Sequence, residues 1–256
     1  MIRRAELALL GVAIVTCAPN AFAVRPFITD DARVVGKHQA QIESWARWDE
    51  HSQQHWTVAA IGPVAPLELS IGAVHGVAIH DETHRYSLAA PLLQAKLLLH
   101  EARSNEWPGV AVIGGSFLPF GFGGFQAPLS GFAYLAATQV IGRDDVLVHT
   151  NVGLAGAAVA EPSARTSQEL ERHARLRFTW GLGTQIHVYR SVNLALETFT
   201  GDPYAEVGGG AAQGGFRFIL SDNIQLDATG GSGLWGKPQM EAWASAGLRL
   251  VSDRLW

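Results

Sequence analysis

The stretch Leu176-Arg177-Phe178-Thr179-Trp180-Gly181-Leu182-Gly183-Thr184-Gln185 alternates large apolar side chains with polar residues or glycine. Successive side chains of a β-strand point to opposite faces, so this spacing predicts a strand with one apolar and one polar face. The same alternation recurs in the segments 38–49, 192–197, 213–220 and 224–229. Repeated strands of this kind indicate a sheet that contacts lipid on one side and water on the other.

Weaker strand signals complete the pattern. Segments bounded by turn residues lie at 54–62, 66–79, 85–100, 109–117, 130–141, 146–156 and 239–250. The segment 85–100 changes phase at Pro91, which suggests a bulge. The count is about twelve strands, and an even number returns the C-terminus to the side of the N-terminus. We therefore expect an all-β fold, an antiparallel transmembrane β-barrel of about 12 strands.

The lengths of the connections alternate, as they do in barrels with tight periplasmic turns and longer outer loops. Short turns are expected at 62–66, 143–145, 190–191 and 221–223, with a less regular connection at 101–108, and longer outer loops at 118–129, 157–172, 201–206 and 231–238. Aromatic residues near the strand ends are expected at the lipid headgroups: Trp48, Trp56, Tyr86, Trp107, Phe117, Tyr189, Phe199, Tyr204 and Trp235. Both termini should then be periplasmic.

The first 23 residues have the composition of a cleaved signal peptide. Two arginines precede the apolar stretch Leu7 to Thr16, and Ala21-Phe22-Ala23 is a small-x-small cleavage site. We expect residues 1–23 to be removed, residues 24–36 to form an N-terminal periplasmic segment, and residues 37–256 to form the barrel. Cys17 is the one cysteine and lies in the signal peptide, so the mature chain should contain no disulfide. The expected location is the outer membrane of a Gram-negative cell.

Charge excludes one class of partner. The formal net charge is -4, and no basic stripe is available for phosphates, so we expect no nucleic-acid partner. The expected partners are outer-membrane lipid, a small hydrophobic solute and, during biogenesis, the outer-membrane assembly machinery. The last of these is suggested by the C-terminal aromatic residue Trp256.

The segment Arg25-Pro26-Phe27-Ile28-Thr29-Asp30-Asp31, followed by Gly36 and by Gln41-Ile42-Glu43, resembles the opening of a known family. These are the outer-membrane transporters labelled for the MetA pathway of phenol degradation. The resemblance implies a barrel of about this size that moves hydrophobic or aromatic compounds. From the residues themselves, Thr29, Asp30 and Asp31 favour a turn into the first strand. An anionic cluster at the periplasmic mouth, pairing with a lumenal arginine or binding a cation, is the alternative.

Charged residues on the polar faces are candidates for lumen and selectivity sites. They are Glu43, Arg47, Lys96, Arg177, Glu197, Arg217, Asp227 and Arg249. Opposite charges across a narrow lumen can pair and brace the wall, or they can set selectivity through the field along a water-filled pore. Both interpretations remain open at this point.

A second candidate is the glycine-rich and phenylalanine-rich stretch from Gly114 to Phe125. As an outer loop it could fold inward and present Phe117, Phe120, Phe122 and Phe125 to an apolar solute, or it could pack its own rings against the barrel rim. We take these four phenylalanines as a candidate substrate-contact loop. A nucleotide-binding role would need a following helix, and none is expected.

Metal, cofactor and catalytic chemistry are not expected. His51 and His55, and His80 with Asp81 and His84, could bind zinc or copper, but exposed loop histidines are mostly unliganded. His149 with Asn151 is the nearest hint of a hydrolytic site, and no nucleophile motif accompanies the pair. The favoured function is an outer-membrane channel or transporter for small, hydrophobic or aromatic solutes. The alternatives are a barrel-anchored enzyme acting on envelope lipid, which would depend on His149, and a structural or surface-binding barrel with a plugged lumen.

Overall fold

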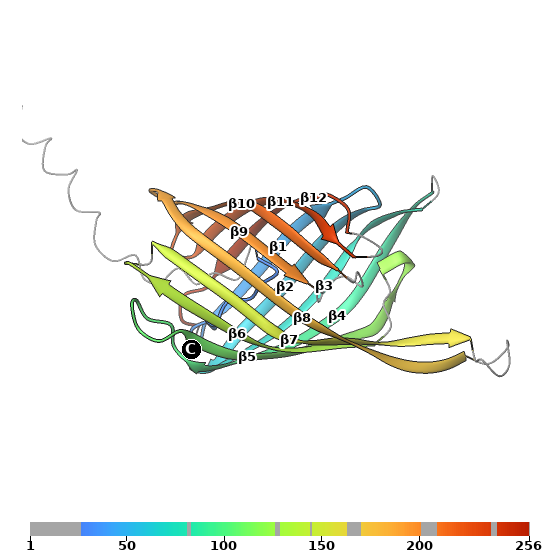
Figure 1. Cartoon of the computed structure of the whole chain (residues 1–256), viewed down its shortest axis with the longest axis horizontal. Helices are drawn as coiled ribbons and strands as arrows, with labels where there is room; N and C mark the ends of the chain where they lie inside the picture. Colours follow the sequence, from blue (N-terminus) through green and yellow to red (C-terminus); the bar gives the residue numbers. More distant parts are fainter. Residues whose placement is uncertain are drawn as a thin grey trace, which may run out of the picture.

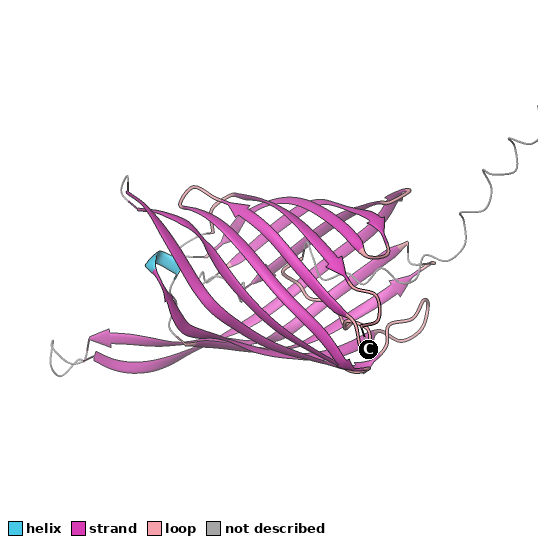
Figure 2. Cartoon of the chain, turned by 180° about the vertical axis from the view of Figure 1, so that it is seen from behind, coloured by secondary structure: helices cyan, strands magenta, loops and turns pink. Residues whose placement is uncertain are grey.

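A computed structural model describes residues 27–80, 83–125, 129–143, 145–162, 170–200, 209–236 and 240–255. The expected signal peptide and Trp256 lie outside these residues. The described chain forms twelve strands and one short helical turn, which wrap around a common axis (Figures 1 and 2). The strands are β1 (Ala40–Trp48), β2 (Ser52–Val64), β3 (Leu67–His80), β4 (Thr83–His100), β5 (Gly109–Phe122), β6 (Ser130–Ile141), β7 (Val146–Pro162), β8 (Leu170–Tyr189), β9 (Val192–Thr200), β10 (Gly210–Ser221), β11 (Ile224–Trp235) and β12 (Trp243–Val251), and η1 (Gly123–Phe125) follows β5.

The sheet closes on itself. Each strand pairs antiparallel with its neighbours in sequence, and β1 pairs with β12 from Gln41 opposite Val251 to Trp48 opposite Ala244. Closure leaves no unpaired edge where the described strands all run side by side, which is the condition for placing backbone N–H and C=O groups in hydrocarbon. The expected antiparallel barrel of twelve strands is confirmed.

Strands extend further than the sequence indicated at the rim away from the chain termini. The stretch 118–129, expected to be an outer loop, belongs to β5 as far as Phe122 and to η1 as far as Phe125. Most of the expected loop 157–172 is likewise strand, because β7 pairs with β8 as far as Pro162 opposite Leu170. These two strands project beyond the rest of the barrel as a long hairpin (Figure 1). The long connections at this rim of the barrel therefore consist of strand residues as well as loops.

The wall is apolar outside and polar inside. Large apolar residues remain exposed on the outer face of every strand, among them Ile42, Ile71, Leu97, Leu135, Leu154, Phe178, Phe216 and Leu250. Buried polar residues alternate with them on the inner face, among them Gln41, Glu68, Thr138, Asn151, Gln185, Gln213, Gln225 and Ser245. This is the expected arrangement for a barrel that lies in lipid. Among the described residues, no helix has the length and apolar composition needed to cross a membrane.

Aromatic residues near the strand ends divide into two groups. Trp48, Tyr86, Trp107, Tyr189 and Trp235 are exposed, as expected for residues at the headgroup level. Trp56, Phe117 and Phe199 instead point inward and are buried, so their expected headgroup placement is wrong. Their even or odd position in the strand, rather than their distance from its end, decides the face. Tyr204 lies outside the described residues.

An arginine placed on the outer wall should destabilise the barrel. Ile71 lies on the outer face of β3 and is 54% exposed. Ile71→Arg should lower the free energy of unfolding by about 2 kcal/mol or more, because its charge must enter hydrocarbon. Urea unfolding in lipid vesicles would measure the change. Gln53→Arg, on the outer face of β2 close to the rim, is the control and should cost less than about 1 kcal/mol. Equal effects at the two positions would contradict the assignment of this face to lipid.

Candidate functional site

The eight charged residues expected in the lumen all lie on the inner face of the wall. Glu43, Lys96, Glu197, Arg217, Asp227 and Arg249 are buried, and Arg47 and Arg177 are half-buried. Arg249 of β12 bonds Gln41 of β1 through Nε at 3.1 Å and Nη2 at 2.8 Å, and its Nε lies 3.6 Å from the Glu43 carboxylate. This group braces the seam at which the barrel closes. Arg217 of β10 faces Asp227 in register and donates to the side-chain oxygen of Gln185.

Residues 27–35, which we call the lumen segment, lie inside the barrel. Residues 24–36 were expected to form a periplasmic segment, and the described part of that range bonds to inward-facing side chains of the wall instead. Thr29, Asp31 and Ala32 are buried among inward-facing side chains from opposite walls. The cause is chemical complementarity, since the polar inner wall offers the partners that this extended, non-strand backbone requires.

Side chains of the wall bind the backbone of the lumen segment. The Glu197 carboxylate of β9 accepts from the N–H groups of Ile28 at 2.7 Å and Thr29 at 2.8 Å. On β6, Thr138 accepts from Ala32 N–H at 2.8 Å, and on β3 Glu68 accepts from Val35 N–H at 2.8 Å. These contacts replace the hydrogen bonds that a sheet neighbour would provide.

Glycines on β8 let the lumen segment approach the wall. A Cβ on Gly181 would collide with the side chain of Thr29, and one on Gly183 would press on the ring of Phe27 at 3.1 Å. The alternation of apolar residues with glycine in β8 therefore has a second function, which is to leave room inside. The spacing of these glycines is a sequence signal that could have pointed to an occupant of the lumen.

Asp30 and Asp31 form the charged centre of the segment. Lys96 of β4 donates to Asp30 Oδ1 at 2.6 Å and to the Arg33 carbonyl at 3.1 Å, and its Nζ lies 3.7 Å from Asp31. Tyr134 donates to the second oxygen of Asp30 at 3.2 Å, and Arg33 pairs with Asp31 at 2.9 Å. The two aspartates thus pair with a lysine of the wall and an arginine of the segment, inside the lumen rather than at its mouth.

His149 and Asn151 hold the lumen segment as well. His149 is buried on the inner face of β7, with Nδ1 3.0 Å from Thr138 Oγ1 and its ring 5.4 Å from that of Phe27. With its amide oriented so that both groups are satisfied, Asn151 accepts from Asp30 N–H at 2.7 Å and donates to Asp30 C=O at 2.8 Å. Since both residues face away from lipid, the geometry does not support an envelope-lipid enzyme built on His149.

An aromatic layer that was not expected from the sequence lies inside the barrel. Trp45 of β1 stacks on Trp56 of β2 with ring centroids 5.5 Å apart, and Phe117 meets Trp56 edge-on at 5.9 Å. Phe132 and Tyr134 of β6 stack at 5.7 Å and belong to the same cluster. In β1 the inward positions run from Gln41 through Glu43 to Trp45. The aromatic layer therefore lies closer than Gln41 and Glu43 to the end of the barrel at which β1 connects to β2. Ala32 of the lumen segment also packs against it.

The four phenylalanines of the candidate contact loop do not share one surface. Phe117 belongs to the buried aromatic layer, and Phe125 in η1 is half-buried against that layer. Phe120 and Phe122 are 63% and 50% exposed near the end of β5. A single solute-binding loop made of all four is therefore not what the chain forms, although Phe117 and Phe125 do lie beside the lumen.

Two small pockets remain beside the lumen segment. One is enclosed by Ile28, Thr29, Phe132, Tyr134, Asn151, Ala155, Thr179, Trp180, Gly181, Phe199 and Thr200, and the other by Phe27, Ile28, Asp30, Gln41, Glu43, Trp45, Val58, Glu68, Ser70, Leu92, Gln94 and Tyr134. The segment lines both pockets, and the aromatic layer contributes to each. Its position therefore controls the free space in this part of the barrel.

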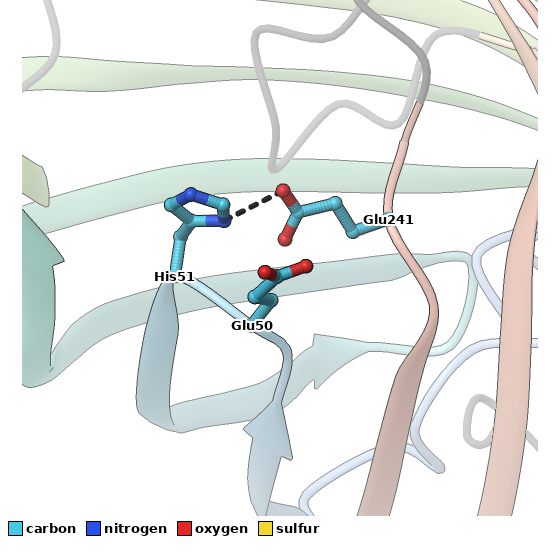
Figure 3. A group of neighbouring side chains, drawn as sticks. All are labelled: Glu50, His51 and Glu241. Atoms are coloured by element: carbon cyan, nitrogen blue, oxygen red, sulfur yellow. Dashed lines mark ion pairs between the residues drawn. The ribbon is translucent and has the colours of Figure 1, made fainter.

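The histidines considered as metal ligands do not gather in one group. His51 precedes β2, and its Nδ1 lies 2.6 Å from the carboxylate of Glu241, with Glu50 beside them (Figure 3). Ligand atoms of these three residues lie within 4.8 Å of one another. Because exposed carboxylates often gather without a metal, we assign the group to an ion pair between two connections. The hydrogen bond to Glu241 raises the pKa of His51 above its ordinary value. His55 faces the outer wall, while Asp81 and the side chains of His80 and His84 lie outside the described residues.

Comparisons with known proteins address the fold. No family model matches the chain, and a search of characterised proteins gave no match. The COG4313 outer membrane channel from Pseudomonas putida F1 superposes with a TM-score of 0.61 at 11% identity, over 93% of this chain and 100% of that chain. A NanC porin structure superposes with a TM-score of 0.52 at 10% identity, over 84% of this chain and 100% of that chain. At these identities the likeness establishes an outer-membrane type of barrel fold.

Removal of the buried lysine should release the lumen segment. Lys96→Met leaves Asp30 and Asp31 buried with less compensating charge, and breaking a buried pair in this way costs about 3–5 kcal/mol. Trypsin should then cleave after Arg33, which is shielded in the parent protein, and mass spectrometry would identify the cut. Lys37→Met is the control, because the Lys37 side chain is exposed. Protection of Arg33 in Lys96→Met would show that the ion pair does not hold the segment.

The His51 contact should depend on pH. Because pairing with Glu241 raises the pKa of His51 in the folded state, the contact contributes fully below the ordinary pKa of 6.5 and is lost as pH rises through the raised value. In Glu241→Gln, NMR titration should show the His51 pKa shifted down toward 6.5. Glu106→Gln, which removes an exposed carboxylate in the β4–β5 connection, should leave it unchanged. The assignment fails if both variants titrate His51 alike.

Proposed function

We propose that this chain forms an outer-membrane channel for small hydrophobic or aromatic solutes, and that its own N-terminal segment narrows the route. The observation that carries this proposal is an apolar aromatic layer inside a barrel whose inner wall also bears many buried polar side chains. A barrel that served only to brace its wall would need the polar pairs alone. Stacked rings such as Trp45 and Trp56 offer a flat apolar surface to an aromatic solute.

The lumen segment gives this route a gate. Its contacts with the wall are polar side-chain bonds, concentrated on Glu197, Glu68, Thr138 and Lys96. Such bonds can be exchanged for water when the segment moves, whereas a strand inserted in the sheet would have to be peeled away. The pockets on both sides of the segment would join once it is displaced, because the segment lines each of them.

Two further observations support the proposal. The two structural neighbours are an outer membrane channel and a porin. The resemblance of residues 25–31 to the MetA-pathway transporters implies hydrophobic or aromatic cargo, and it stays a prediction. The cleaved signal peptide, the periplasmic termini and the assembly machinery as a partner are part of the same proposal.

Conductance and its block by an aromatic solute test the proposal together. In planar bilayers the purified barrel should give discrete steps, and Lys96→Met should give larger or more frequent ones because the lumen segment is released. Phenol added to the chamber should reduce the current. Trp45→Ala and Trp56→Ala should weaken that block up to about tenfold, since ring pairs are worth about 0.5–1.5 kcal/mol.

Trp235→Ala is the matched control, because Trp235 lies on the outer face with 47% of its side chain exposed. Its block by phenol should equal that of the parent protein. A gel shift on heating would show that each variant forms the barrel. A tight electrical seal for both the parent and Lys96→Met would contradict a channel, and block that is insensitive to Trp45 and Trp56 would contradict an aromatic route.

A further inference from the structure

A row of polar side chains crosses the outer wall. Ser44 of β1, His55 of β2, His75 of β3 and Tyr86 of β4 come from four adjacent strands. Their sequence neighbours Trp45, Trp56, Val74 and Ser87 are buried on the inner face. Because successive side chains of a strand alternate, the four residues of this row, which we call the outer row, face away from the lumen.

The outer row forms one continuous chain of hydrogen bonds. Ser44 Oγ lies 2.9 Å from His55 Nε2, His55 Nδ1 lies 3.0 Å from His75 Nε2, and His75 Nδ1 lies 3.0 Å from the Tyr86 hydroxyl. The protons can run along this chain in either direction, and one of the two directions leaves His55 Nε2 free to act as a base. In that direction Ser44 donates to His55, His55 donates to His75, and His75 donates to Tyr86.

This geometry has the elements of an activated nucleophile. A serine hydroxyl lies within reach of an imidazole base, and a third group fixes the orientation of that base and accepts from its other nitrogen. His75 occupies the position of the third group, and Tyr86 fixes His75 in turn. His55 and His75 are directly opposite each other, while Ser44 and Tyr86 are reached diagonally from the adjoining strands. Four polar side chains on a lipid-facing wall are unfavourable unless they bond one another, as they do here.

The depth of the outer row selects the substrate class. Trp48 and Tyr86 are exposed aromatic residues of the same part of the wall, and such residues favour the headgroup level. The ester bonds of membrane lipids lie at that boundary, next to the hydrocarbon. A lipid in the surrounding leaflet would therefore present its ester carbonyl to Ser44 without entering the barrel.

We propose that Ser44, His55 and His75 form a catalytic site that hydrolyses acyl esters of membrane lipids. The Ser44 oxygen attacks the ester carbonyl carbon while its proton passes to His55 Nε2. The bond to the alcohol oxygen then breaks, and that oxygen takes the proton from His55, which leaves an acyl group on Ser44. Water attacks this acyl group and gives a proton to His55, and the Ser44 oxygen leaves with that proton. The sum is ester plus water giving acid plus alcohol.

This site is independent of the proposed channel. It lies on the opposite face of the wall from the lumen segment, and it uses neither His149 nor Asn151. Loss of conductance would leave it intact, and loss of hydrolysis would leave the route through the lumen intact. Conductance therefore tests the channel, and hydrolysis tests the catalytic site.

The experiment uses the full folded barrel in detergent–phospholipid mixed micelles. A fluorophosphonate probe should label it covalently, and mass spectrometry should place the label on the peptide that contains Ser44. The same preparation should release fatty acid from phosphatidylglycerol. Ser44→Ala should abolish both labelling and release, and His55→Gln should lower kcat/KM by about 10²–10⁴-fold, the usual contribution of a general base.

His75 is the positioning residue and needs a readout of its own. His75→Ala should lower kcat with little change in KM, and His75→Gln should restore part of kcat, because its amide oxygen can accept from His55 near the place of the lost ring nitrogen. Ser232→Ala, on the exposed face of β11, and His100→Gln, in the last residue of β4, are the matched controls and should behave as the parent. Folding of every variant is shown by the heat-dependent gel shift.

Two results would overturn the proposal. One is a folded parent protein that neither reacts with the probe nor releases fatty acid. The other is labelling or turnover that persists in folded Ser44→Ala. Labelling confined to Ser44 and dependent on His55 would support the site.

Discussion

The need to bond every backbone amide in hydrocarbon is the constraint on which the rest of this structure depends. Pairing of β1 with β12 meets it by closing the sheet, with Trp48 opposite Ala244 at one end of the seam. Closure also creates an inner face, and an entirely apolar inner face would enclose a dry cavity. Polar inward side chains therefore alternate with apolar outward ones along each strand. The same alternation that makes the outside suitable for lipid fills the inside with groups that need partners.

The lumen segment meets that second need. Carboxylates such as Glu197 and Glu68 gain backbone N–H partners, and Lys96 gains the carboxylate of Asp30. A charged group left alone in this interior would be strongly unfavourable, and the pairs remove that penalty only while the segment is in place. Wall and segment are therefore stabilised by each other. The aromatic layer contributes a different surface, on which dispersion and stacking replace charge.

Period-two alternation was sufficient to predict the strand number, the closed antiparallel architecture and the inward direction of residues such as Arg217. It was not sufficient for the interior. The bond between Lys96 and Asp30 joins residues 66 positions apart, and nothing local marks the pair. Trp56 was assigned to the headgroup level by its residue type, although its position in the strand placed it inside. The outer row depends on the register of four strands at once, which no single stretch of sequence records. A short stretch of sequence gives the type of each residue and the face of the strand on which it lies. It does not give the contacts that the residue makes across the barrel.

The lumen segment connects strands that lie far apart around the barrel. Side chains of β3, β4, β6, β7 and β9 form hydrogen bonds with residues 28–35. These five strands are spread over the barrel from β3 to β9, so the peptide is bonded to several sides of the surrounding wall. Strand number and stagger determine the radius of the barrel, and the enclosed peptide links distant parts of the wall from within, so that its removal would leave those strands joined only through their neighbours.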